Sequence, residues 1–180
     1  MAEAGVVTIV DNMAKVVEAI ARLASTRVMV GVPSEQALRR PAPGEPRQVN
    51  NAMLAYIHEN GAPTVGIPPR PFLRPGVKDA RTSIAAALRI GGVLALKGDA
   101  AGMERQFHIA GARARDAVKL KITTGPFVPL KPATIAKRRV RSRGSKYRRK
   151  ATTAAQVTPL VDTGALRNAI NYVIRRVYGR

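Results

Sequence analysis

The sequence of 180 residues contains no cysteine and no tryptophan, and aromatic residues make up only 4% of it. Without cysteine there can be no disulfide, no thiolate nucleophile and no cysteine metal ligand, which fits a reducing compartment. Apolar residues nevertheless account for 46% of the chain, enough for one domain with a hydrophobic core. That core must be built mainly from alanine, valine, isoleucine and leucine.

Acidic residues are also scarce. The chain has 31 lysines and arginines against 11 aspartates and glutamates, which gives a formal net charge of +20. Residues 1–90 hold 11 basic and 7 acidic side chains (+4), whereas residues 91–180 hold 20 and 4 (+16). Such an asymmetry indicates an anionic partner, which can be nucleic acid, a membrane surface or an acidic protein.

Residues for catalysis or cofactor binding are missing too. The two histidines are isolated: we expect His58 to be a surface or packing residue and His108 to lie on the polar face of a helix. The acids form no pair suited to acid–base catalysis or magnesium binding. No GxxxxGK[ST] or GxGxxG pattern occurs. The sequence therefore predicts no catalytic residue, no metal and no cofactor, and we do not expect an enzyme.

Long hydrophobic runs are absent as well. No apolar run approaches the roughly 20 residues that span a bilayer. The first residues, MAEAGVV, lack the basic lead and apolar core of a signal peptide. We therefore expect a soluble protein without a membrane partner.

Hydrophobic periodicity predicts three main helices, over residues 11–24, 78–96 and 99–122. Gly91 and Gly92 are expected to interrupt the second of them. The third is the most regular, because apolar residues recur along it at steps of three and four. These residues are Met103, Phe107, Ala110, Ala114, Val118 and Ile122. Shorter helices are expected at about 50–60 and 132–135.

Two segments in which apolar residues alternate predict strands, at 27–32 and 169–177. We expect these strands to belong to a small, mostly antiparallel sheet packed by about three helices. The predicted fold class is therefore α+β, in a single domain over residues 1–180. Prolines and a glycine place an exposed loop at 34–48.

Proline and glycine are concentrated between residues 55 and 77, AYIHENGAPTVGIPPRPFLRPGV. Five prolines exclude a helix interior or a central strand, so we predict an extended, Pro-rich arm over 61–77. A stiff arm loses little entropy on docking, which suits contact with a neighbouring subunit. Phe72→Ala would then leave the monomer folded and block assembly. The alternative is a loop on the chain's own core. The expected contact residues are Ile67, Arg70, Phe72, Leu73 and Arg74.

A basic loop is predicted over residues 137–157. Its first fourteen residues, KRRVRSRGSKYRRK, contain nine basic side chains and no acid, so repulsion should keep the segment extended or disordered in isolation. Such a segment can grip DNA phosphates or an acidic protein, and the alternative is a solvated or protein-binding loop. The nine residues expected to contact DNA or an acidic partner are Lys137, Arg138, Arg139, Arg141, Arg143, Lys146, Arg148, Arg149 and Lys150.

Residues 161–165, VDTGA, read like the Asp-Thr-Gly loop of aspartic proteases, in which two aspartates share a proton. Only 16 residues follow Gly164, too few for the apolar half-lobe that such a protease needs. We therefore predict a structural turn, in which Asp162 or Thr163 caps a short helix and Gly164 permits the turn.

Three segments together resemble the small virion-morphogenesis, or tail-completion, proteins of tailed bacteriophages. They are NAMLAYIHENGAPTVGIPPRPFLRPGV (51–77), PLKPATIAKRR (129–139) and TPLVDTGALRNAI (158–170), in this order. The family pattern is an (E)xGxxxxxIPxRPFL arm followed by helices, then a PLxPxTIxxR turn, then PLxDTGxLxxSI leading into a strand. Glu59 and Gly61 occupy the first two fixed places. Ala169 stands where the family often has serine, and the basic run after the second segment is unusually long.

The resemblance implies a structural virion protein, part of the neck or tail-completion ring that joins the head connector to the tail. Subunits would form a ring, expected to be sixfold, in contact with connector or stopper proteins and with tail-terminator or tail-tube proteins. The basic loop would face the end of the double-stranded DNA genome or an acidic protein surface. Such a protein is assembled in the host bacterial cytoplasm and found in the virion. The alternative is a basic nucleic-acid-binding module without a ring role.

Overall fold

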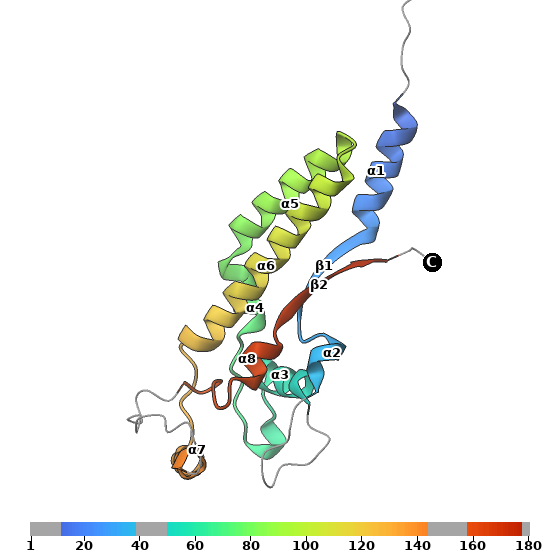
Figure 1. Cartoon of the computed structure of the whole chain (residues 1–180). Coiled ribbons are helices and arrows are strands. Elements are labelled where there is room, and N and C mark those ends of the chain that lie inside the picture. Colours follow the sequence, from blue (N-terminus) through green and yellow to red (C-terminus); the bar gives the residue numbers. More distant parts are fainter. Residues whose placement is uncertain (1–11, 39–49, 144–157, 178–180) are drawn as a thin grey trace, which may run out of the picture.

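Two antiparallel helices, α5 (Arg81–Leu96) and α6 (Ala100–Thr124), set the long axis of the molecule (Figure 1). The structure, a computed structural model, describes residues 12–38, 50–143 and 158–177, with side chains described to residue 138 of the middle range. Asp99 caps α6, because its carboxylate accepts the N–H of Gly102 at 2.7 Å. All six apolar residues of the predicted stripe along α6 are buried.

A two-stranded antiparallel sheet lies along α6. It pairs β1 (Thr26–Gly31) with β2 (Asn171–Arg176), so that Val28 is opposite Ile174 and Val30 is opposite Tyr172. Gly111 of α6 allows β2 to approach the helix closely, since a Cβ at this position would overlap the Tyr172 ring. The mixture of helices with a small antiparallel sheet agrees with the predicted α+β class at this coarse level.

The helix α1 (Met13–Ser25) leads into β1 and lies beside the α5–α6 turn (Figure 1). A small buried cluster of Ala95, Met103 and Phe107 fills this end, and Leu23 of α1 packs against it. Most of the apolar face of α1 remains exposed. The exposed residues on it are Met13, Val17 and Ile20.

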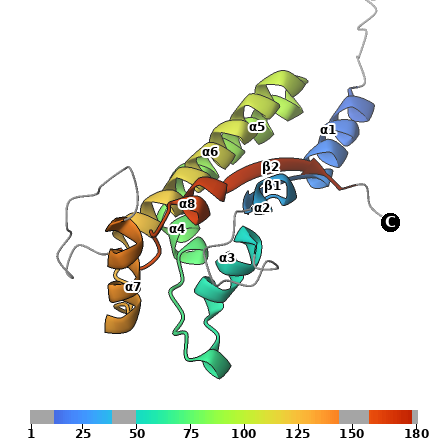
Figure 2. The ribbon, with the colours of Figure 1, turned by 60° about the horizontal axis from the view of Figure 1, so that its bottom comes forward.

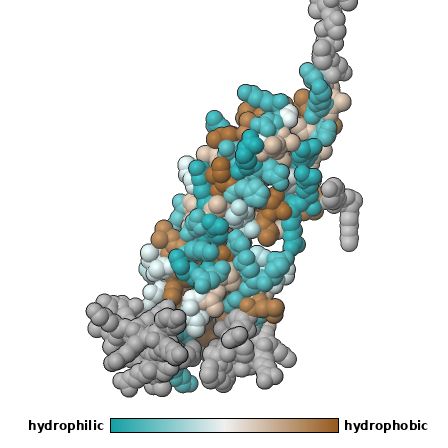
Figure 3. Space-filling view, in the orientation of Figure 1, coloured by the Kyte–Doolittle hydropathy of each residue, from teal (hydrophilic) through white to brown (hydrophobic). Residues whose placement is uncertain are grey.

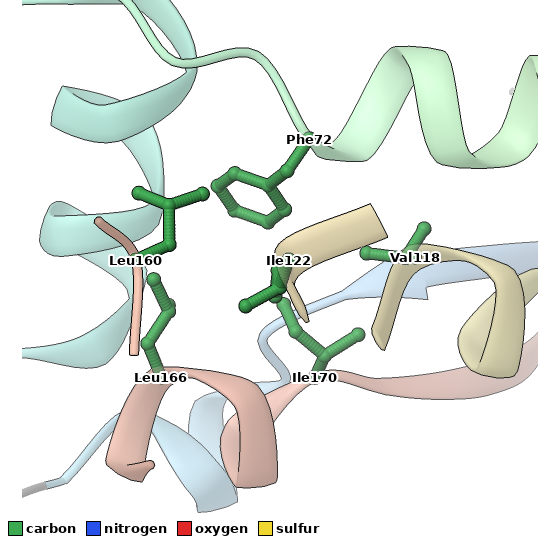
Figure 4. Close-up of a cluster of buried hydrophobic side chains, with 6 residues drawn as sticks. All are labelled: Phe72, Val118, Ile122, Leu160, Leu166 and Ile170. Carbon is green, nitrogen blue, oxygen red and sulfur yellow. The ribbon is translucent and has the colours of Figure 1, made fainter. Parts of the chain in front are cut away.

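The shorter helices gather around the C-terminal end of α6 (Figures 1 and 2). The main hydrophobic core lies there, and its six side chains point toward one another (Figure 4). These core residues are Phe72, Val118, Ile122, Leu160, Leu166 and Ile170. The shorter elements of the molecule are α2 (Ser34–Ala37), α3 (Asn51–Asn60), the 3-10 turn η1 (Pro63–Val65), α4 (Leu73–Asp79), α7 (Pro132–Arg143) and α8 (Ala165–Ala169), and of these α3, α4 and α8 contribute side chains to the core or against it.

The structure corrects the prediction of an arm that is extended throughout 61–77. Residues 63–65 form η1 and α4 begins at Leu73, so only residues 67–72, between them, have neither helix nor turn. Pro75 is tolerated since it lies in the first turn of α4, where a backbone N–H has no partner within the helix. The predicted interruption at Gly91 and Gly92 is also absent: α5 runs through both glycines.

The prediction of a basic loop over 137–157 is wrong for 137–143, which continue α7. Lysine and arginine are good helix formers, and Pro132 provides a favourable first residue. The rest of the predicted basic loop, 144–157, lies outside the described residues. The predicted loop at 34–48 begins with α2, and its residues 39–48 are likewise outside the described ranges.

Candidate interaction site at the junction of three motif segments

The three segments that carry the family resemblance meet at one place beside the C-terminal end of α6. Arg70 and Phe72 from the first segment, Arg138 from the second and Leu160 from the third make the links between them, and Glu59 fixes the arm within the first segment. We call these five residues the motif junction. The contacts below show how each of them is held.

Glu59 fixes the start of α4. Its carboxylate accepts the backbone N–H groups of Phe72 and Leu73 at 2.8 Å each, and that of Arg74 at 3.1 Å. A carboxylate at a helix N-terminus satisfies the free N–H groups and opposes the positive end of the helix dipole. The adjacent carbonyl of His58 accepts the N–H of Arg70 at 2.7 Å. The Pro-rich arm is therefore bound to α3 at residue 70 and at the start of α4.

Arg70 joins the first segment to the second. Its side chain is buried, with 5% of the residue exposed. Nε donates to the carbonyl of Val128 at 2.8 Å, and Nη2 donates to that of Pro129 at 3.2 Å. Hydrogen bonds from a charged donor are stronger than those between neutral groups, so Arg70 fixes the 128–129 backbone against the arm.

Arg138 joins the second segment to the third. Its Nη2 donates to the carbonyl of Pro159 at 2.9 Å, and Nη1 donates to those of Thr158 and Val161 at 3.2 and 3.3 Å. Its Nε lies 3.8 Å from Oδ1 of Asp162. Arg138 thus organises the turn before α8.

Phe72 and Leu160 connect the first and third segments through the main core. Phe72 is 1% exposed, and its ring lies beside Leu160 and Ile122 (Figure 4). These contacts correct the predicted roles of two arm residues: Arg70 and Phe72 are buried against their own chain and are not presented to a neighbour. The alternative of a loop that lies on the chain's own core describes them better.

The other predicted contact residues are more accessible. Ile67 is half-buried and forms an isolated bridge with Ala62. Leu73 is half-buried, and Arg74 is exposed beside it. Both border a groove of about 410 Å³ next to the motif junction. The groove is lined mainly by residues of α3, of the end of β1 and of the start of α4, and Tyr56 at its edge is 69% exposed.

The predicted anion-binding residues differ in their surroundings. Lys137 is exposed on α7. Arg138, in contrast, donates hydrogen bonds to backbone carbonyls of its own chain. The prediction that Arg138 contacts DNA or an acidic partner is therefore corrected. The side chains of Arg139, Arg141, Arg143, Lys146, Arg148, Arg149 and Lys150 lie outside those described. Sequence reasoning placed Glu59 in the family pattern but did not predict its contact with the start of α4, because no spacing signal connects it to N–H groups 13 to 15 residues later.

The Asp-Thr-Gly sequence forms a turn before α8. Gly164 has φ +82°, a left-handed conformation that favours glycine, and the Thr163 hydroxyl accepts the N–H of Ala165 at 3.2 Å. The Asp162 carboxylate faces Arg138 rather than capping the helix. The residues predicted for this turn, Asp162, Thr163 and Gly164, are therefore placed next to the motif junction.

His58 is half-buried and close enough to both arginines of the motif junction for their charges to act on it. Burial lowers the pKa of its imidazole from 6.5 to about 4, and the positive charges of Arg70 and Arg138 contribute to the shift. The histidine is therefore neutral in the folded protein at pH 7. Protonation would place a third positive charge beside two arginines.

This arrangement predicts a loss of stability in mild acid. The unfolded chain binds the proton of His58 below about pH 6.5, and the folded chain only near pH 4, so stability falls as the pH drops through this window. We expect the free energy of unfolding to fall by at most about 2 kcal/mol between pH 7 and pH 4.5 because of His58. Urea unfolding at both pH values measures this difference. His58→Gln should reduce the difference, and identical pH dependence in both proteins would contradict the assignment.

Neither a metal site nor a membrane helix is found in the ranges that the structure describes. No group of three or more metal-binding side chains (His, Asp or Glu) gathers there. None of the helices described combines the length and the hydrophobicity that crossing a bilayer requires. Comparisons with protein-family models, with curated proteins and with solved structures returned no match.

Proposed function

We propose that this chain is a structural virion protein of a tailed bacteriophage and forms part of the neck or tail-completion ring that joins the head connector to the tail. The observation that carries the proposal is the motif junction. Three segments resemble the family in the same order, and their residues are in direct contact. The resemblance therefore concerns one connected structural unit rather than three unrelated loops.

The roles of individual residues support this reading. Arg70, Phe72, Leu160 and Leu166 all belong to the family pattern, and each is buried within the same end of the molecule. Pattern residues that hold a core are expected to be shared by proteins with the same architecture. No step of this argument needs a catalytic group, so the proposed function is architectural.

Self-assembly is supported by the apolar side chains left at the surface. Apolar residues that are about half exposed or more occur on α1 and α5, and Figure 3 shows hydrophobic patches among the hydrophilic side chains. Extended apolar patches on a small protein often mark interaction sites. The residues concerned are Met13, Val17, Ile20, Ile90, Val93 and Leu96. The ring is expected to be sixfold, as the resemblance implies.

Contacts with neighbouring neck or tail proteins are assigned to the groove beside the motif junction. Arg74 and Tyr56 are exposed at its edge, and Leu73 contributes an apolar wall. The stiff first part of the arm holds these groups in place, which reduces the entropy lost on binding. The connector or stopper, and the tail-terminator or tail-tube proteins, are the proposed partners in the virion.

Light scattering of the purified protein at low and high salt, followed by particle imaging, tests the proposal. Rings that persist in high salt are expected, because an apolar interface is not screened. The double variant Tyr56→Ala/Arg74→Ala should weaken binding to the partner proteins, and the control Arg81→Ala/Arg89→Ala should not. A monomer at every salt concentration that binds duplex DNA would favour the nucleic-acid-binding module instead.

A further inference from the structure

A second group of basic side chains lies on α6, in a part of the sequence that precedes the predicted basic loop. His108, Arg115 and Lys119 occupy one flank of this helix, since they are separated by seven and by four residues. Tyr172 of β2 lies beside the first two of them, and its hydroxyl lies 3.1 Å from Nδ1 of His108. Tyr172 of the strand β2 therefore packs against His108 and Arg115 on this flank of α6.

Arg115 is held in a defined orientation. Its Nε donates to Oδ1 of Asp116 at 2.7 Å, and its guanidinium carbon lies 5.7 Å from the centre of the Tyr172 ring. A guanidinium stacked on an aromatic ring loses little entropy when it binds an anion. In the part of the chain that the structure describes, its two terminal nitrogens make no hydrogen bond or ion pair.

Lys119 lies close to two other cations. It follows Arg115 by one helical turn on α6, and the charge of Arg167, on α8, acts on it. Val118 and Leu166, which precede Lys119 and Arg167 in the chain, both belong to the main core. Burial lowers the pKa of Lys119, and the charges of Arg115 and then Arg167 lower it further against the opposing effect of Asp116.

We propose that Arg115, Lys119 and Arg167 form a binding surface for the phosphate backbone of duplex DNA. Asp116 offsets one of the three positive charges, and an external anion would relieve the repulsion that remains. Four residues along α6 correspond to a rise of about 6 Å, similar to the spacing of successive phosphates along one strand. Such contacts are independent of base sequence and are strengthened by counterion release. This inference goes beyond the proposed ring and does not depend on it.

The salt dependence of DNA binding tests this surface in the full chain. Fluorescence anisotropy with a 30-base-pair duplex would be measured for wild type and for Arg115→Gln/Lys119→Gln/Arg167→Gln. Each lost phosphate contact reduces the slope of log K against log salt by about 0.9, so we expect the slope to fall by about 2 to 3. The matched control, Arg81→Gln/Arg89→Gln/Lys97→Gln, removes three exposed charges from α5 and its end and should change the slope by less than about 1.

Two further measurements separate this surface from other effects. The variant Arg115→Lys/Arg167→Lys keeps the charges and should keep the wild-type slope, whereas misfolding of the Gln variant would show as a lost thermal transition. In wild type, DNA should protect Lys119 from acetylation more than Lys97. Equal slopes for the two Gln variants, equal protection of the two lysines, or equally effective competition by polyglutamate at the same charge concentration would overturn the proposal.

Discussion

Replacing Phe72 with alanine is expected to destabilise the folded protein by about 3–5 kcal/mol. The ring is 1% exposed and packs in the main core between the first and third motif segments. Its removal forfeits the transfer of a large apolar group from water and leaves a cavity in a close-packed region. This expectation replaces the prediction from sequence that the variant would fold normally and fail only in assembly.

Urea unfolding followed by circular dichroism measures the effect of Phe72→Ala on the free energy of unfolding. The matched control is Val65→Ala on the same arm, because Val65 is 67% exposed and should change stability by less than about 0.5 kcal/mol. The two variants should therefore have clearly different midpoints. Phe72→Ala with a wild-type midpoint and a loss of partner binding would restore the original interpretation of the arm as an external contact.

Replacing Arg70 with methionine should lower the free energy of unfolding by about 2–3 kcal/mol, the second large effect that we expect. Methionine keeps much of the volume but removes both hydrogen bonds to the carbonyls of Val128 and Pro129. Arg70→Lys keeps the charge but loses the two-point geometry, so an intermediate loss is expected.

Thermal unfolding of the Arg70 variants can be compared with that of Arg74→Met. Arg74 is exposed four residues further along, so its loss should lie within about 0.5 kcal/mol of wild type. The comparison separates the buried hydrogen bonds from a general effect of net charge. Equal melting temperatures for Arg70→Met and Arg74→Met would show that the link between the first two segments contributes nothing to stability.

The helices and strands that sequence analysis located well are those specified by local patterns. The apolar stripe from Met103 to Ile122 indicates which face of the helix is buried, because residues three and four apart share one side of a helix. Alternation around Val28 and Ile174 likewise predicts strands with one inner face. Such patterns need no knowledge of what the element packs against.

The motif junction could not be predicted in the same way. Proline content indicates that the arm is stiff, but it does not indicate which surface the arm contacts. The cap on α4 depends on Glu59 meeting N–H groups from a later part of the chain. Composition likewise assigns Arg138 to a basic run, whereas its hydrogen bonds depend on the position of Pro159 after folding. These contacts are tertiary and leave no periodic signal.

Joining of heads to tails is the most direct test of the proposed role. Extracts of infected cells that lack this chain would be examined by electron microscopy before and after addition of the purified protein. Separate heads and tails that become complete virions on addition are predicted, with a lower yield for Tyr56→Ala/Arg74→Ala than for wild type. Complete virions without the protein, or no change on adding it, would contradict a role at the head–tail junction.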